Sequence, residues 1–177
     1  MEISTGSWHI SIVDEARSSF NSRKIRSYPV VVNLDDPAPP YSVYGIFCNT
    51  APVVLLAACA GGPTVVHAHS AFFLDGRLYV AIANRIVCLS LRPFTLHWVL
   101  GADEATCCGV YFHSPTRALL ARGELSIMRF TEAGALLWQS PGRDIFTGPL
   151  SLASAFVRVL DCMGREYRFR YHDGSVA

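Results

Sequence analysis

Residues 125–138 read LSIMRFTEAGALLW, and residues 85–98, forty positions earlier, read RIVCLSLRPFTLHW. Each segment is an apolar run, a turn and a second apolar run that ends in tryptophan, so Trp98 and Trp138 lie 40 positions apart. A recurrence of about forty residues is typical of folds in which every repeat is one small sheet. We interpret the two segments as one structural unit whose tryptophan docks between neighbouring sheets, and we expect both tryptophans to be largely buried.

Turn residues divide the second half of the chain into short apolar segments. Asp75-Gly76, Pro93 and Met163-Gly164 separate runs that alternate with the two-residue period of a strand. The strands expected from this pattern span residues 77–83, 86–91, 95–100, 117–121, 125–130, 135–139, 155–161 and 166–171. The sequence therefore predicts an all-β fold of antiparallel sheets built from four-strand, blade-like repeats, arranged as an incomplete propeller or a sandwich.

The 177 residues fit a single domain with four parts. Strands and a Pro-rich loop are expected in residues 1–69, full repeats in 70–108 and 109–148, and a partial third repeat in 149–177. We also expect a short helix over residues 14–24, capped by Asp14. Because a closed propeller needs at least about four blades, the terminal sheets must be covered by the N-terminal residues or by another chain.

Composition narrows the class of partner. Apolar residues make up 51% of the chain and charged residues only 16%, below the usual ~25%, which indicates sheets buried on both faces or an apolar surface that meets a partner. The net charge of +1 gives no electrostatic signature of nucleic acid or anionic lipid, and no apolar run approaches the ~20 residues of a membrane span. A protein partner or a second copy of the chain is the expected partner.

The cysteines and histidines give weak signals of metal or redox chemistry. The six cysteines contain no CxxC spacing and the chain opens without an export signal, so we expect reduced thiols and a cytoplasmic protein. The sequence His67-Ala68-His69 would place two imidazoles on one face of a strand, with His113 or Cys107 as a third ligand. An isolated HxH is common and no carboxylate stands at a metal-site spacing, so we expect a polar strand end and neither a metal nor another cofactor.

Charged residues recur in the loops that follow the two tryptophan-ended strands. Because equivalent loops of a propeller cluster in space and often form a binding rim, we expect a shared pocket or, more simply, solvated turns. The candidate binding residues are Asp103, Glu104, Glu124, Arg143, Asp144 and His69. A separate basic cluster contains Arg158, Arg165, Arg168 and Arg170. Acidic residues lie beside that cluster in the sequence, so it is interpreted as a solvated strand face.

The stretch GRLYVAIANRIVCLSLRPFTLHW, residues 76–98, resembles the repeat of pyrroloquinoline-quinone-type and WD40-like β-propellers. In the quinone family a strand carrying Ala-Leu-Asp is followed by a Thr-Gly turn and an apolar strand that ends in tryptophan. Cys88-Leu89-Ser90, Pro93-Phe94-Thr95 and Trp98 stand in these places, and the second copy has Met128-Arg129-Phe130, Ala133-Gly134 and Trp138. The resemblance covers about residues 70–177, lacks the aspartate in both copies and has the turn glycine only in the second. It implies blade geometry, and no cofactor residue is carried over.

Three functions fit these features. The favoured one is a non-catalytic binding or interaction protein, since no nucleophile elbow, phosphate loop or paired-carboxylate motif is present. A small bacterial protein that neutralises a toxin would belong to this class, although nothing in the sequence selects that role. The alternatives are a small enzyme that uses Asp103, Glu124 and Asp144, and a structural protein that self-assembles by pairing edge strands.

Overall fold

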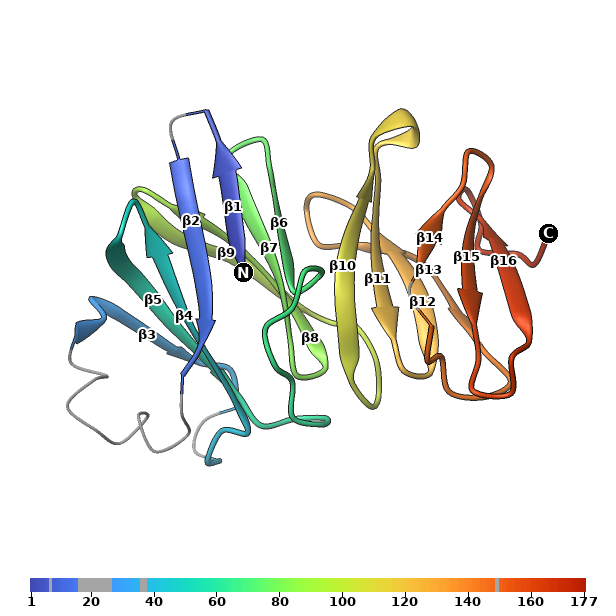
Figure 1. Cartoon of the computed structure of the whole chain (residues 1–177), viewed down its shortest axis with the longest axis horizontal. Coiled ribbons are helices and arrows are strands. Elements are labelled where there is room, and N and C mark those ends of the chain that lie inside the picture. The colour runs from blue at the N-terminus through green and yellow to red at the C-terminus, as the bar shows by residue number, and fades with distance from the viewer. Residues whose placement is uncertain (7, 16–26, 36–37, 149) are drawn as a thin grey trace.

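Four sheets stand side by side in sequence order, as the computed structural model shows for residues 1–6, 8–15, 27–35, 38–148 and 150–177 (Figure 1). The predicted all-β fold is confirmed. A single 3₁₀ turn at Ser114–Thr116 interrupts the strands of residues 38–148. No helix in the described ranges is long and apolar enough to cross a membrane.

The N-terminal sheet has the order β1-β2-β4-β5-β3. Its strands are β1 (Glu2–Thr5), β2 (Trp8–Asp14), β3 (Val30–Asn33), β4 (Ser42–Cys48) and β5 (Ala51–Ala58). All pairs are antiparallel except β3 with β5, which is parallel, so this sheet is not a simple meander. The helix expected over residues 14–24 falls almost entirely outside the described residues, and Asp14, its expected cap, is instead the last residue of β2.

The other three sheets are antiparallel and follow chain order. The second sheet contains β6 (Ala71–Leu74), β7 (Arg77–Ile82), β8 (Arg85–Leu91) and β9 (Phe94–Gly101). The third sheet contains β10 (Cys107–His113), β11 (Ala118–Gly123), β12 (Ser126–Phe130) and β13 (Leu136–Pro141). The last sheet contains β14 (Ser151–Leu152), β15 (Phe156–Leu160) and β16 (Glu166–Arg170). All eight strands expected in this half are present, because alternation and turn residues specify them locally.

Apolar side chains fill three junctions between successive sheets. The first junction joins the N-terminal and second sheets through residues such as Tyr44, Leu56 and Val87. The second junction joins the second and third sheets, and the third junction joins the third and last sheets. The two middle sheets are therefore buried on both faces, which explains the uninterrupted apolar run of β8. The N-terminal sheet covers the face of the second sheet that has no preceding repeat.

The two tryptophans dock on the following sheet in the same way. The indole N–H of Trp98 donates to the carbonyl oxygen of Glu132 at 3.0 Å, and that of Trp138 donates to the carbonyl of Tyr171 at 2.8 Å. Each ring lies on a glycine with positive φ, Gly134 under Trp98 and Gly174 under Trp138, where an added Cβ would approach the ring to 2.6 and 2.5 Å. The forty-residue repeat therefore includes the glycine as well as the tryptophan.

The two tryptophans differ in burial, which corrects one expectation. Trp138 is 8% exposed, as predicted, but Trp98 is only half-buried. The reason is its position on β9, the outer strand of its sheet, where Leu96 and Val99 on either side are exposed. The prediction that both rings would be largely buried is wrong for Trp98.

Candidate functional site

An open pocket of about 820 Å³ lies at the outer end of the second junction. Its walls come from the end of β9, the linker after it, the start of β12, and the end of β13 with the linker that follows. The lining residues are Gly101, Asp103, Glu104, Leu125, Ser126, Gln139, Pro141, Gly142, Arg143, Asp144 and Ile145. The volume lies in the range of ligand-binding pockets. The structure thus brings together Asp103, Glu104, Arg143 and Asp144, as expected for equivalent loops of successive repeats.

Asp103 is a structural carboxylate at the back of this pocket. Its Oδ2 accepts hydrogen bonds from the backbone N–H of Leu125 (3.1 Å), and from the N–H (3.0 Å) and hydroxyl (2.9 Å) of Ser126, while Oδ1 accepts from the N–H of Ala105 (2.8 Å). Gly123 makes room for it, because a Cβ there would collide with the carboxylate. Asp103 therefore fastens the second sheet to the turn between β11 and β12.

Gln139 completes this polar wall from the other side. Its amide Nε2 donates to the hydroxyl of Ser126 at 2.7 Å and to the carbonyl of Ala102 at 3.3 Å. The side chain of Gln139 thus joins β13 to the linker that carries Asp103. Hydrogen bonds between the second and third sheets therefore fix the floor of the pocket.

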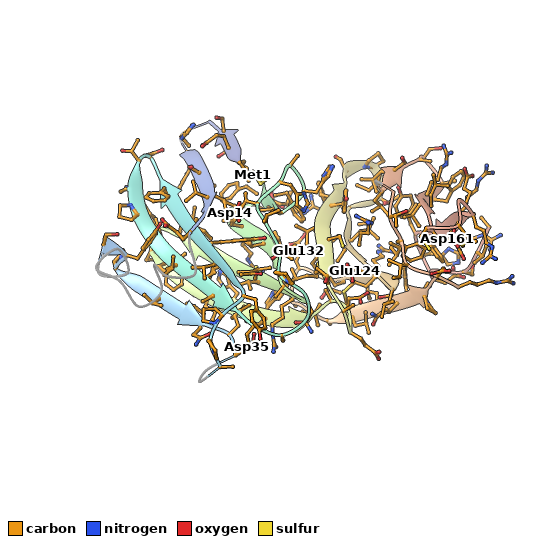
Figure 2. All side chains as sticks on the ribbon, turned by 60° about the horizontal axis from the view of Figure 1, so that its bottom comes forward. Met1, Asp14, Asp35, Glu124, Glu132 and Asp161 are labelled. Carbon is orange, nitrogen blue, oxygen red and sulfur yellow. The ribbon has the colours of Figure 1, made fainter. Side chains whose placement is uncertain are left out.

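The linker after β13 is held to the turn that precedes β12. The N–H of Gly142 donates to the carbonyl of Leu125 (3.0 Å), and the N–H of Phe146 donates to the carbonyl of Glu124 (2.7 Å). Glu124, labelled in Figure 2, is half-buried on this turn and does not line the pocket. Of the expected binding residues, Glu124 contributes here through its backbone.

The rim carries charges that are not neutralised within the pocket. Glu104 and Arg143 are exposed, and neither forms an ion pair with any residue that the structure describes. The backbone N–H of Arg143 donates to the hydroxyl of Tyr167 at 3.0 Å, which positions this residue against the last sheet. Within the same linker, Oδ1 of Asp144 accepts a hydrogen bond from the backbone N–H of Ile145 at 2.9 Å.

Two apolar residues at the mouth were not expected from the sequence. Leu125 is 40% exposed and Ile145 is 44% exposed, although both lie beside the buried second and third junctions. A single large apolar residue in a loop carries no periodic signal, so sequence reasoning could not separate it from a core residue. Together with Pro141 they add an apolar part to the lining of the pocket.

His69 lies away from the pocket. Its ring stacks on Tyr111 with centroids 4.6 Å apart, and its carbonyl accepts the N–H of Val110 on β10. The strand expected at His67-Ala68-His69 is wrong, because these residues form a turn in which the N–H of His67 donates to the hydroxyl of Ser70 at 2.9 Å. No group of three or more histidines, cysteines and acidic residues suited to a metal ion occurs among the described residues.

All six cysteines are free thiols. Burial raises the pKa of Cys107 to about 12 and that of Cys88 to about 11, so both remain protonated at neutral pH. Burial also raises the pKa of the half-buried Cys108, so neither thiol of the Cys107-Cys108 pair has the environment of a nucleophile.

The pocket combines fixed polar walls, an apolar mouth and unpaired rim charges. None of its lining residues is a histidine, cysteine or lysine, and the hydroxyl of Ser126 donates to a carboxylate that already accepts three other hydrogen bonds. No model of a known protein family matches the chain, and no curated protein matches it.

Proposed function

We propose that the protein is a non-catalytic interaction protein with propeller-like blades, and that it holds a segment of a protein partner in the pocket of the second junction. The observation that carries this proposal is that the exposed apolar residues Leu125 and Ile145 line the same pocket as the unpaired charges of Glu104 and Arg143. An apolar centre within a polar rim is the usual anatomy of a protein-binding surface. The six free thiols support work in a reducing compartment such as the cytoplasm.

The chemistry of the rim also specifies the partner segment. A bulky apolar side chain would fill the space between Leu125 and Ile145, which removes apolar surface from water on both sides. A basic side chain next to it would face Glu104 and Asp144, and an acidic one would face Arg143. A segment of mixed charge around one large apolar anchor therefore fits best.

The enzyme alternative has less support from the geometry. It requires Asp103, Glu124 and Asp144 to act on one substrate, but Asp103 is saturated with hydrogen bonds and Glu124 does not line the pocket. Self-assembly remains compatible with the proposal, because a second copy of the chain would be one kind of protein partner.

Selection from a displayed library of random peptides tests the proposal. We expect enriched peptides to carry a large apolar residue beside lysine or arginine, and to bind Leu125→Asp at least about tenfold more weakly than the wild type, because the anchor then meets a charge. Leu137→Asp is the matched control, since Leu137 is 51% exposed on β13 but lies outside the pocket.

Three results would count against the proposal. Equal binding of the selected peptides to both variants would place the site elsewhere. Failure to enrich any peptide, together with a monomer mass by light scattering at every concentration, would leave no protein partner for the pocket. Turnover of a substrate that is abolished by Asp144→Asn would favour the enzyme.

A further inference from the structure

The outer face of the last sheet is a second surface of unusual chemistry. This sheet stands at the end of the row, and one of its faces packs into the third junction through Val157, Val159 and Phe169 (Figure 1). Strand alternation places the other side chains on the opposite face. We call this the arginine face; its residues are Phe156, Arg158, Leu160, Glu166, Arg168 and Arg170.

Two arginines of this face stand directly opposite each other. Arg158 on β15 pairs in register with Arg168 on β16, an arrangement of like charges that destabilises a sheet. Glu166 reduces the repulsion by bonding both: its Oε2 lies 2.6 Å from Nε of Arg158, and its Oε1 lies 2.6 Å from Nε of Arg168. The hydrogen bond from Arg168 is the main reason that the pKa of Glu166 is lowered.

The face keeps an excess of positive charge. Arg170 donates to the hydroxyl of Ser175 at 2.9 Å and to the carbonyl of Val176 at 3.3 Å, and it forms no ion pair among the described residues. The pKa of the nearby Asp173 is lowered mainly by hydrogen bonds from Ser175, and the charge of Arg170 helps to lower it. Three guanidinium groups and one carboxylate leave a net charge of +2 on the arginine face. The side chains of Arg158 and Arg168 are 50% and 54% exposed, so their remaining N–H donors can reach an incoming acceptor.

An apolar element lies within the charged surface. The guanidinium carbon of Arg168 stands 5.2 Å from the ring centroid of Phe156, which is itself half-buried. This stacking holds the guanidinium plane over the face and limits its rotamers. An outer face that only had to remain solvated would not require arginine opposite arginine, or an aromatic ring to orient one of them.

We propose that the arginine face docks an acidic segment of a protein partner. Guanidinium groups bind carboxylates through two parallel hydrogen bonds, and three of them on one face offer several such places at strand spacing. A nucleic acid is a poorer fit for this face. Only three arginines lie on it, two of them (Arg158 and Arg168) already bond Glu166, and the net charge of the whole chain is only +1. This surface is separate from the pocket of the second junction, so the inference does not depend on that site.

Fluorescence anisotropy with a labelled peptide of ten glutamates tests the inference. We expect binding at low ionic strength that weakens as salt is added, and that falls about tenfold when Arg158→Gln and Arg168→Gln are combined. Arg170→Gln should weaken binding severalfold, whereas Arg92→Gln should leave it unchanged. Arg92 is exposed between β8 and β9, outside both the pocket and the arginine face, and like Arg170 it donates to a backbone carbonyl, that of Cys48 at 3.2 Å. Thermal melts of each variant show whether the fold is retained.

Each remaining outcome is decisive. If the glutamate peptide does not bind at low salt, or if Arg92→Gln weakens it as much as Arg170→Gln, the inference is wrong. If a single-stranded oligonucleotide binds more tightly than the peptide and the same variants lose it, the partner is a nucleic acid and not an acidic protein. Should the double glutamine variant fail to fold, the comparison of Arg170→Gln with Arg92→Gln still gives the answer.

Discussion

The second and third junctions share one tryptophan–glycine contact, but only the second junction opens into a pocket. In both, a tryptophan donates to a carbonyl of the next sheet and rests on a glycine of its turn. In both junctions an arginine donates to that same carbonyl, Arg77 to Glu132 at 3.0 Å and Arg129 to Tyr171 at 2.6 Å. Only in the third junction does the hydroxyl of Ser140 add a hydrogen bond, to the carbonyl of Gly174 at 2.7 Å. The second junction leaves its tryptophan half-exposed and opens into the pocket. The shared parts of the repeat are therefore structural, and the pocket lies where one repeat departs from the other.

The largest expected effect is the loss of the buried tryptophan. Trp138→Ala should lower the free energy of unfolding by about 3–5 kcal/mol, the range for truncating a large core aromatic. Trp98→Ala should cost clearly less, about 1–3 kcal/mol, because half-exposed apolar surface contributes less on burial. Urea unfolding of both variants measures the difference. Equal losses would contradict the contrast between the two junctions.

The glycine under Trp138 should be nearly as sensitive. Gly174→Ala adds a Cβ that meets the ring and also places a non-glycine residue at φ +71°, so we expect a loss of about 2–4 kcal/mol. Gly164→Ala is the matched control, since Gly164 has φ +77° but no atom within 4 Å of the added Cβ. Its loss should be limited to about 1–2 kcal/mol of backbone strain. Chemical denaturation that gave both variants the same stability would remove the packing role of the glycine.

The next expected effect concerns the hydrogen bonds by which Asp103 joins the second and third sheets. Asp103→Ala leaves the N–H groups of Leu125 and Ser126 without their acceptor and should destabilise the protein by about 1–3 kcal/mol. Hydrogen exchange should then accelerate at the amides of these two residues more than elsewhere. An unchanged exchange rate there would show that Asp103 does not fasten the two sheets.

A smaller effect is expected from pH in the last sheet. Burial acts to raise the pKa of Asp161, but hydrogen bonds from the N–H of Arg165, the hydroxyl of Tyr167 and the N–H of Met163 outweigh it and lower the pKa. Since the folded pKa is below the unfolded one, the stabilisation is present above the unfolded value and is lost as pH falls through the folded value. Asp161→Asn should therefore flatten the decline of stability below about pH 4. A decline as steep as in the wild type, measured by thermal melts across pH, would rule this out.

The sequence predicted local features well because their causes are local. Alternation and the Asp75-Gly76 turn determine β6 and β7, with φ of 48° and 81° at the two turn residues. The parallel pairing of β3 with β5 joins residues 24 positions apart, such as Val30 and Val54, and no local pattern signals it. The recurrence of Trp98 and Trp138 predicted that both rings would pack on a neighbouring sheet. The exposure of Trp98 depends on the position of β9 at the edge of its sheet, which the forty-residue pattern does not reveal.

In the candidate site, too, the features with a local cause could be predicted and those that depend on distant residues could not. The forty-residue period predicted that the loops at Asp103 and Arg143 would meet, and they line one pocket. The structural role of Asp103 could not be predicted, since its donors stand 22 and 23 positions further along the chain. His69 and Glu124 failed to join the pocket because loop residues close in sequence to a rim can point toward another strand.

Hydrogen exchange of the protein with and without a library-selected peptide tests most directly whether the open second junction is the binding site. We expect the peptide to protect amides in residues 124–126 and 142–146, which border the pocket, and to leave those at 171–175 in the closed third junction unchanged. The stability of Leu125→Asp should stay within about 0.5 kcal/mol of the wild type, as for an exposed residue, while the protection disappears. Protection centred on residues 171–175, or protection that persists in Leu125→Asp, would contradict the assignment.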